Sequence, residues 1–221
     1  MPVGGRSPSV RSTVRRSRRD GARQDQLVAQ LEDLLLGEGF TALTMDDLAA
    51  RLHCSKATLY GIAPSKEQLV LRVTKHFFQC SAEKVEAAVE KESDPRRRIA
   101  TYINEIGRAM RRQSAAFYAD MLAFPPAAEV YQANADLAAR RVGELIDDGV
   151  RRGEFRALDG TFVARLVGLA IRGVQTGSLL EDGELTAGEA LTQLADLVLH
   201  GLTSTGGATS SPARSATGPR S

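Results

Sequence analysis

The sequence has few of the residues on which common catalytic and metal sites are built. Its 221 residues include only three histidines and two cysteines, and no recognisable nucleophile or metal motif accompanies them. No run approaches the ~20 apolar residues of a transmembrane helix. The segment from Met1 to Gly21 lacks the apolar core of a secretory signal, and two cysteines cannot form a disulfide scaffold. We therefore expect a cytoplasmic protein that is not an enzyme and has no cofactor or metal.

Positive charge is concentrated at the N-terminus, although the net charge is only +2. Seven arginines fall within the first 23 residues, against one acid, Asp20. Such a segment suits contact with a polyanion such as nucleic acid, and a solvated tail is the alternative interpretation. Because residues 1–22 are rich in Gly, Ser, Pro and Arg without apolar periodicity, we expect a disordered arm, with a second disordered tail at residues 203–221.

Between these tails, apolar residues recur at helical spacing and no segment alternates as a strand would. The sequence therefore predicts an all-α fold. The expected helices cover residues 23–37, a short segment from 44, 56–61, a long segment from 65, 95–113, 114–124, 127–152, 159–180 and 186–202. The predicted division is an N-terminal helical domain at 23–70 and a larger C-terminal helical domain at 71–202.

Three hydroxyl residues predict the starts of successive helices. Thr44 precedes an acidic first turn in the manner of a capping box, Ser55 can cap the next helix, and Ser65 can cap the long one, with Gln68 as its partner. The turn through His53 between the second and third helices is about three residues long. This spacing is typical of a helix-turn-helix.

The stretch from Thr44 to Leu69 resembles the DNA-binding signature of the tetracycline-repressor (TetR) family. The best-matching pieces are Ser55-Lys56, Thr58-Leu59-Tyr60 and Pro64-Ser65-Lys66-Glu67. The resemblance implies a homodimeric bacterial regulator that binds double-stranded operator DNA. It also implies a repressor that a small-molecule effector releases, with no membrane partner.

The third helix presents small or polar residues, which allow a helix to approach base edges in the major groove. By resemblance, the DNA-contacting residues are Thr44, Ser55, Lys56, Ala57, Thr58, Tyr60 and Lys66. The arm contributes Arg15, Arg16, Arg18 and Arg19 as further candidates. The sequence departs from the family at Gly61-Ile62-Ala63, which replace an aromatic, a histidine and a phenylalanine, and at His53, which occupies a turn position where glycine is common.

The C-terminal helices predict two further surfaces. The helix at 159–180 is apolar on two faces, which indicates burial on both, and pairing of two copies through a four-helix interface explains this. The expected interface residues are Phe162, Leu166, Leu169, Gly173, Leu194, Leu197 and Val198. The expected effector-pocket residues are Tyr102, Ile106, Met110, Phe117, Met121, Phe124, Tyr131, Arg172 and Gln175, with ordinary core packing as the alternative.

Other functions stay open at this point. His76 and Cys80 are four residues apart on one helix, so a regulator that responds to metal or to thiol oxidation through Cys54 and Cys80 is an alternative. A helical enzyme is a remoter one: Asp147 and Asp148 are adjacent and point about 100° apart, and we expect both to be solvated. A purely structural helical protein would leave the capped helices behind the arginine arm unexplained.

Overall fold

The computed structural model describes residues 10–176, 178–180, 185 and 187–202, and this part of the chain contains nine helices and no strand. The predicted all-α fold is therefore confirmed. The helices are α1 (Val10–Glu38), α2 (Met45–Arg51), α3 (Lys56–Tyr60), α4 (Lys66–Val89), α5 (Pro95–Met110), α6 (Ala115–Ala123), α7 (Pro125–Arg151), α8 (Gly160–Gln175) and α9 (Ala187–Leu202). None of the described helices is long and apolar enough to span a bilayer.

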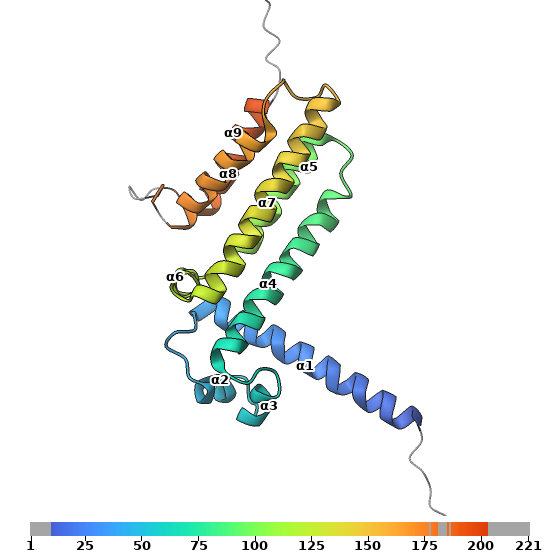
Figure 1. The fold of residues 1–221 in the computed structure, drawn as a ribbon, viewed down its shortest axis with the longest axis vertical. Helices are drawn as coiled ribbons and strands as arrows, with labels where there is room; N and C mark the ends of the chain where they lie inside the picture. Colours follow the sequence, from blue (N-terminus) through green and yellow to red (C-terminus); the bar gives the residue numbers. More distant parts are fainter. Residues whose placement is uncertain (1–9, 177, 181–184, 186, 203–221) are drawn as a thin grey trace, which may run out of the picture.

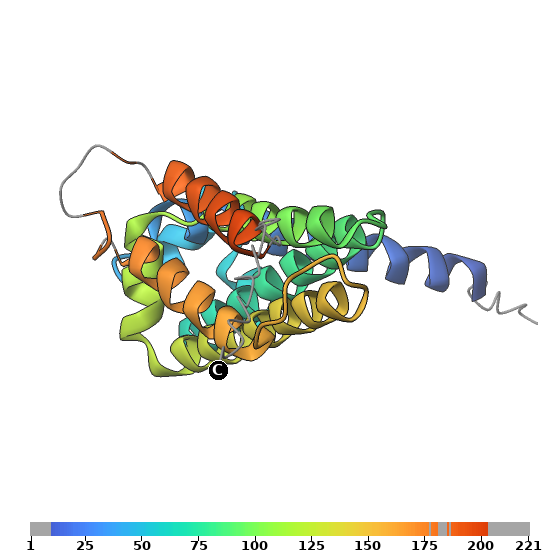
Figure 2. The same cartoon turned by 90° about the horizontal axis from the view of Figure 1, so that it is seen from above.

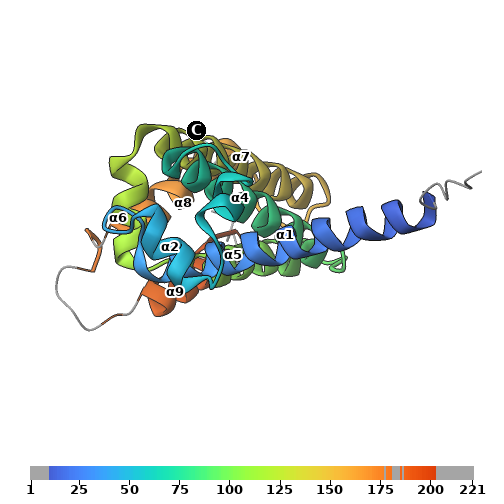
Figure 3. The ribbon, with the colours of Figure 1, turned by 90° about the horizontal axis from the view of Figure 1, so that it is seen from below.

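The arrangement separates a small end from a long bundle. Helices α1, α2 and α3 gather at the lower end of Figure 1, and α4 runs from there into the bundle. Seen from below, α1 and α2 lie across this end (Figure 3). At the other side of the bundle, α8 packs against α7, and α9 packs against α5 (Figure 2).

Helix α1 begins earlier than the sequence predicted. Its backbone is helical from Val10, so the prediction of disorder is wrong over residues 10–22, while residues 1–9 and 203–221 lie outside the described part of the chain. Arginine is a good helix former, and the arginine run adjoins the Leu27–Leu36 segment whose packing fixes the rest of the helix. From Val10 onward, the backbone of the arginine arm therefore belongs to a helix that projects from the body of the molecule (Figure 1).

The predicted caps of the helix-turn-helix are confirmed. The Thr44 side chain accepts a hydrogen bond from the Asp47 N–H and the Asp47 side chain accepts from the Thr44 N–H, which completes a capping box. Ser55 accepts from the Thr58 N–H at the start of α3, and Ser65 accepts from the Gln68 N–H at the start of α4. These bonds satisfy backbone donors that have no partner inside the helix.

One continuous helix crosses the predicted domain boundary at residue 70. Helix α4 buries Leu69, Val73 and Phe77 in a core shared with α1, α2, α3, α6 and α7. Its later part buries Val85 and Val89 in a second core with α5, α7, α8 and α9. Both ends of the molecule therefore depend on the packing of the same helix.

A carboxylate on α6 closes the turn after α1. Asp120 Oδ2 accepts hydrogen bonds from the backbone N–H of Phe40 at 2.6 Å and of Thr41 at 2.8 Å. Gly39, at φ +81°, approaches this carboxylate so closely that a Cβ there would lie 2.6 Å from Oδ2. Partial burial by itself would raise the pKa of Asp120, but the Thr41 and Phe40 donors hold it below its ordinary value. The interaction fixes where the second helix begins relative to α6.

We expect Asp120→Asn to lower the free energy of unfolding by about 1–2 kcal/mol at pH 7, because an amide replaces a charged acceptor. The pKa of Asp120 is lower in the folded chain, so its contribution is present above the unfolded value of about 3.9 and is lost as pH falls through the folded value. Urea unfolding of the wild type and variant between pH 7 and pH 3 measures this. A difference in stability that does not shrink below pH 4 would contradict it; Glu129→Gln, on an exposed face of α7, is the control.

Candidate DNA-binding surface and ligand cavity

Helix α3 exposes almost all of its side chains. Leu59 is fully buried and anchors the helix to the core, whereas Lys56, Ala57, Thr58 and Tyr60 are exposed, with Tyr60 at 50%. The helix is only five residues long, so a single apolar anchor is enough to hold it. The predicted reading residues therefore lie on one accessible surface, together with the capping residue Ser55.

Two of these residues have a neighbour within the surface itself. Lys56 Nζ lies 2.6 Å from Asp46 Oδ1 on α2, and this hydrogen bond raises the pKa of Lys56. Ser55 Oγ and Thr58 Oγ1 lie 2.8 Å apart. The Lys56 side chain is 49% exposed and that of Asp46 is 71% exposed. An ion pair this accessible to water contributes little stability, so the Lys56 ammonium can exchange Asp46 for another partner at low cost.

Thr44 and Lys66 have local roles in addition to the predicted ones. Thr44 Oγ1 donates to Asp47 Oδ2 at 2.6 Å, and the Thr44 hydrogen bonds lower the pKa of Asp47. Lys66 is half-buried, and its Nζ donates to the Thr41 carbonyl oxygen at 3.1 Å. Both side chains thus help to hold the segment between α1 and α2.

The departures from the family pattern have a structural outcome. Ile62 and Ala63 are buried in the N-terminal core, so they take over packing that an aromatic would otherwise provide. Gly61 ends α3 in a right-handed conformation. His53 adopts φ +49°, which confirms that it occupies a turn position favourable to glycine.

A cavity of about 410 Å³ lies between α4, α5, α7 and α8. Five of the predicted pocket residues line it: Tyr102, Ile106, Met110, Tyr131 and Arg172. Burial raises the pKa of Tyr102, whose hydroxyl donates weakly to the Ala138 carbonyl oxygen at 3.4 Å. The volume is within the range of small-molecule sites, roughly 300–1,000 Å³.

Three predicted pocket residues lie elsewhere, so their assignment to the cavity is corrected. Phe117 and Met121 are fully buried in the N-terminal core. Phe124 packs edge-on to Phe40 at a centroid distance of 6.2 Å. Aromatic and methionine side chains suit a core as well as a pocket, and α6 turns these residues toward α1. The side chain of Gln175 lies outside the described part of the structure.

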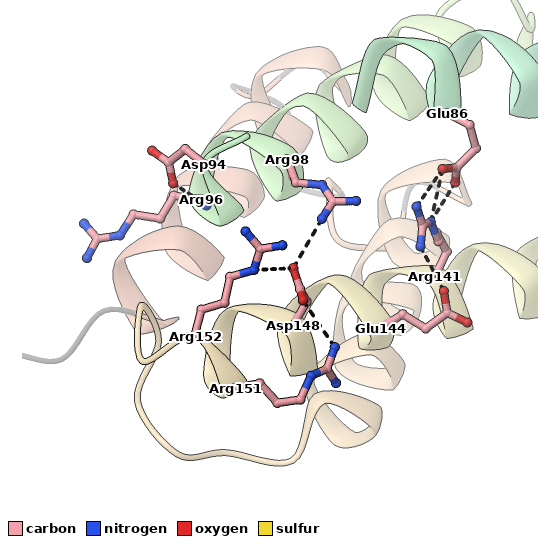
Figure 4. Close-up of polar contacts among 9 residues, drawn as sticks. All are labelled: Glu86, Asp94, Arg96, Arg98, Arg141, Glu144, Asp148, Arg151 and Arg152. Carbon is pink, nitrogen blue, oxygen red and sulfur yellow. Dashed lines mark hydrogen bonds and ion pairs between the residues drawn. The ribbon is translucent and has the colours of Figure 1, made fainter. Parts of the chain in front are cut away.

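Helix α4 supplies a wall of the cavity that the sequence interpretation missed. Phe77, Phe78 and Glu86 line it, and Arg141 on α7 completes the polar part. Arg141 Nε donates to Glu86 Oε1 at 2.9 Å, and Nη2 donates to Oε2 at 2.9 Å (Figure 4). The signal for this wall was the Phe77-Phe78 pair, which falls beyond the helix-turn-helix on a helix too long to serve that motif alone.

An apolar stripe faces outward on α8 and α9. Phe162, Leu166, Leu169 and Leu197 are each between 55% and 70% exposed. Of the remaining predicted interface residues, Gly173, Leu194 and Val198 are half-buried. The opposite face of α8 buries Ala164, Val167 and Val174, so the two apolar faces predicted for this helix are both observed, one of them uncovered.

The alternative chemistries gain no support from the geometry. Cys80 Sγ lies 3.5 Å from His76 Nε2, but no group of three or more His, Cys, Asp or Glu side chains within the described residues is arranged to hold a metal. Burial raises the pKa of the Cys54 and Cys80 thiols, which lowers the fraction of reactive thiolate.

The prediction that Asp147 and Asp148 are both solvated is confirmed for Asp147 and wrong for Asp148. Asp147 is exposed, but Asp148 is only 23% exposed and pairs with Arg98, Arg151 and Arg152 at 3.0–3.3 Å (Figure 4). Sequence adjacency did not show that α5 brings Arg98 over this carboxylate. With its oxygens engaged by three guanidinium groups, Asp148 is a structural anion between α5 and α7.

Residues 27–73 match the family model described as bacterial regulatory proteins, tetR family. No curated protein matches the chain. Solved structures match over most of its length. A putative transcriptional regulator from Saccharomonospora viridis, solved in complex with choline, is 18% identical with a TM-score of 0.70, over 83% of this chain and 98% of its own.

A TetR transcription regulator from Haloarcula marismortui gives a TM-score of 0.70 at 15% identity, over 83% of this chain and 99% of its own. The TetR-family regulator PfmR from Thermus thermophilus gives 0.59 at 22% identity, over 80% and 98%. At these identities the neighbours establish the fold, while the match at residues 27–73 covers the capped helices described above. The family model thus covers the segment that carries the capped helices, and the solved neighbours show that most of the chain shares their fold.

Proposed function

We propose that this chain is a transcriptional regulator of the TetR family, a homodimeric repressor that binds a two-fold operator through α3. It leaves the operator when a small molecule fills the cavity between α4, α5, α7 and α8. The observation that carries the proposal is the combination of an exposed, small-residue α3 with an apolar cavity in the same chain. The neighbour from Saccharomonospora viridis was solved with choline, so a protein of this fold binds a small organic molecule. In this proposal, residues 23–70 bind DNA, and residues 71–202 bind the effector and the second copy of the chain.

On DNA, Ala57 and Thr58 would face base edges because their small side chains permit close approach. Tyr60 would reach a phosphate with its hydroxyl, and Lys56 would exchange Asp46 for a phosphate or base. Ser55, Thr44 and Lys66 would contribute at the starts of α3, α2 and α4, where unpaired N–H groups favour phosphate. The arginines of α1, Arg15, Arg16, Arg18 and Arg19, would add sequence-independent affinity.

The operator follows from selection of bound sequences out of a pool of random duplexes. We expect the enriched sequence to contain two inverted half-sites whose centres are about 34–36 Å apart, or one turn of DNA. Enrichment of single half-sites, or of no sequence at all, would contradict the proposed function.

We expect Lys56→Ala and Tyr60→Ala each to weaken binding to the selected operator by about 1–3 kcal/mol, because each removes a contact to DNA. Lys56→Ala should also reduce the slope of log affinity against log salt by about one. Fluorescence anisotropy at several salt concentrations measures both. Lys91→Ala, an exposed lysine beyond the far end of α4, is the matched control and should bind like the wild type. Wild-type operator affinity in both α3 variants would reject α3 as the reading helix.

The exposed stripe on α8 and α9 supports the proposed dimer. Phe162, Leu166, Leu169 and Leu197 place large apolar side chains in water along two adjacent helices, and a second copy of the same stripe would cover them in a four-helix interface. Gly173, Leu194 and Val198 would complete the contact. Two recognition helices would then be held by one rigid interface.

We expect the double variant Leu166→Glu, Leu197→Glu to be a folded monomer, because four carboxylates would meet across the two-fold axis. Its operator affinity should fall by about a hundredfold or more, since one half-site can no longer assist the other. Sedimentation velocity and circular dichroism measure mass and helicity. Leu122→Glu, an exposed leucine on α6, is the control that should remain dimeric. A double variant that sediments as a dimer would place the interface elsewhere.

An ion cluster formed by α1, α4 and the turn after α5 connects the cavity wall to α1. Glu32 on α1 is buried and lies 2.9 Å from Arg112 Nη2 and 2.7 Å from His76 Nδ1 on α4. The Arg112 guanidinium also lies 5.6 Å from the ring centre of Phe77, a cavity-lining residue. A displacement of Phe77 by a ligand would therefore act on the partner of a buried charge in the DNA-binding end.

Removal of the Arg112 side chain should destabilise the folded chain, because the buried Glu32 carboxylate loses a cationic partner. We expect Arg112→Ala to lower the free energy of unfolding by about 1–3 kcal/mol, because the carboxylate loses its guanidinium partner. Thermal and urea unfolding measure the change. The neighbouring Arg111→Ala, which removes an exposed guanidinium, should be close to neutral. Equal stability of the two variants would show that Arg112 does not stabilise Glu32.

A further inference from the structure

Five charged residues line the cavity, and three of them, Glu86, Arg141 and Glu144, contact one another. Arg141 binds Glu86 through two parallel hydrogen bonds of 2.9 Å, and its Nη1 donates to Glu144 Oε2 at 3.0 Å (Figure 4). Figure 4 shows the single guanidinium lying between the two carboxylates. Both acids of the lining therefore already have a cationic partner.

The remaining two charges are positive. Arg140 is exposed, whereas Arg172 on α8 is half-buried at the cavity wall. Within the described part of the chain, the Arg172 guanidinium has no carboxylate and no hydrogen-bond acceptor. A guanidinium withdrawn from water without a partner is unfavourable, and it is the side chain best suited to bind a carboxylate through two parallel hydrogen bonds.

The rest of the wall is mainly apolar. Phe77, Phe78 and Tyr131 bring aromatic rings, and Ile106, Met110 and Ile171 add aliphatic surface. Gly168, one turn before Arg172, also lines the cavity, and a Cβ there would meet nothing within 4 Å. Open space therefore lies along the same helix that carries the unpaired guanidinium.

We propose that the effector is an amphipathic organic acid, with its carboxylate on Arg172 and its apolar body against the rings of α4 and α7. This inference rests on the proposed function, because it assigns a chemical class to the effector of that cavity. A cationic ligand fits less well: Arg141 already contacts both acids of the lining, and the ligand would approach two further positive side chains. A neutral ligand would leave Arg172 unpaired.

The test uses the full-length protein and three probes that share a ten-carbon chain: decanoate, 1-decanol and decyltrimethylammonium. Each is used below its micelle or solubility limit. A fourth probe, 2-naphthoate, offers the same head group on a flat body. Isothermal titration calorimetry measures binding. We expect both acids to bind, and decanoate to bind about tenfold to a hundredfold more tightly than the alcohol, as is typical for a hydrogen-bonded charge. The cation should bind most weakly.

Variants on α8 separate the head group from the body. Arg172→Gln should weaken decanoate by the same factor and leave decanol unchanged, whereas Arg165→Gln, an exposed arginine outside the cavity lining, should bind like the wild type. Gly168→Leu should block all probes by filling the space, and it should not lower stability, because leucine favours a helix over glycine. Circular dichroism checks the fold of each variant.

Binding of neither acid, equal binding of decanoate and decanol, or tighter binding of the cation would overturn the proposal. Unchanged binding of decanoate by Arg172→Gln would overturn it as well. The affinity of each unliganded variant for the selected operator is measured in parallel. If operator binding is intact while the acids fail, the ligand class is wrong and the regulator function stands; if no operator is bound, the proposed function itself fails.

Discussion

The burial of α4 on two sides is the constraint on which the remaining structure depends. Leu69, Val73 and Phe77 fix its first half in the N-terminal core, and Val85 and Val89 fix its second half in the bundle. Because a helix transmits displacement along its axis more readily than a loop does, the two cores cannot move independently without breaking one of these contacts. The cap at Ser65 matters for the same reason, since it sets where this shared helix starts.

Local chemistry made the DNA-binding end predictable. Thr44, Ser55 and Ser65 each accept a hydrogen bond from the backbone N–H three residues ahead, so their positions in the sequence indicate helix starts directly. The positive φ of His53 was also predictable from the sequence, because His53 occupies the turn position between α2 and α3 where glycine is common. Composition predicted disorder for the arginine arm, because composition describes only the average of a segment. The helix from Val10 depends instead on continuity with the packed part of α1.

Contacts between distant residues account for what the sequence did not show. The bonds of Asp120 to the turn at Phe40 span 80 residues, and that between Arg141 and Glu86 spans 55. No periodicity indicates which arginine meets which acid, so Asp148 looked solvated and Glu86 went unnoticed. Met121 and Met110 are equally plausible pocket residues by composition, yet α6 turns the first into the core while α5 presents the second to the cavity.

In the proposed function, the cavity is where a ligand would influence DNA binding. An unfilled apolar cavity leaves the side chains of its wall with fewer packing partners, at a cost in stability that grows with volume. A molecule that fills the space stabilises the form whose cavity fits it, and only its preference between two forms can change operator affinity. Phe77 touches both the cavity and, through Arg112, the buried Glu32 of α1. In the proposed function, a ligand that repositions this ring would act on the Arg112–Glu32 pair and, through Glu32, on α1.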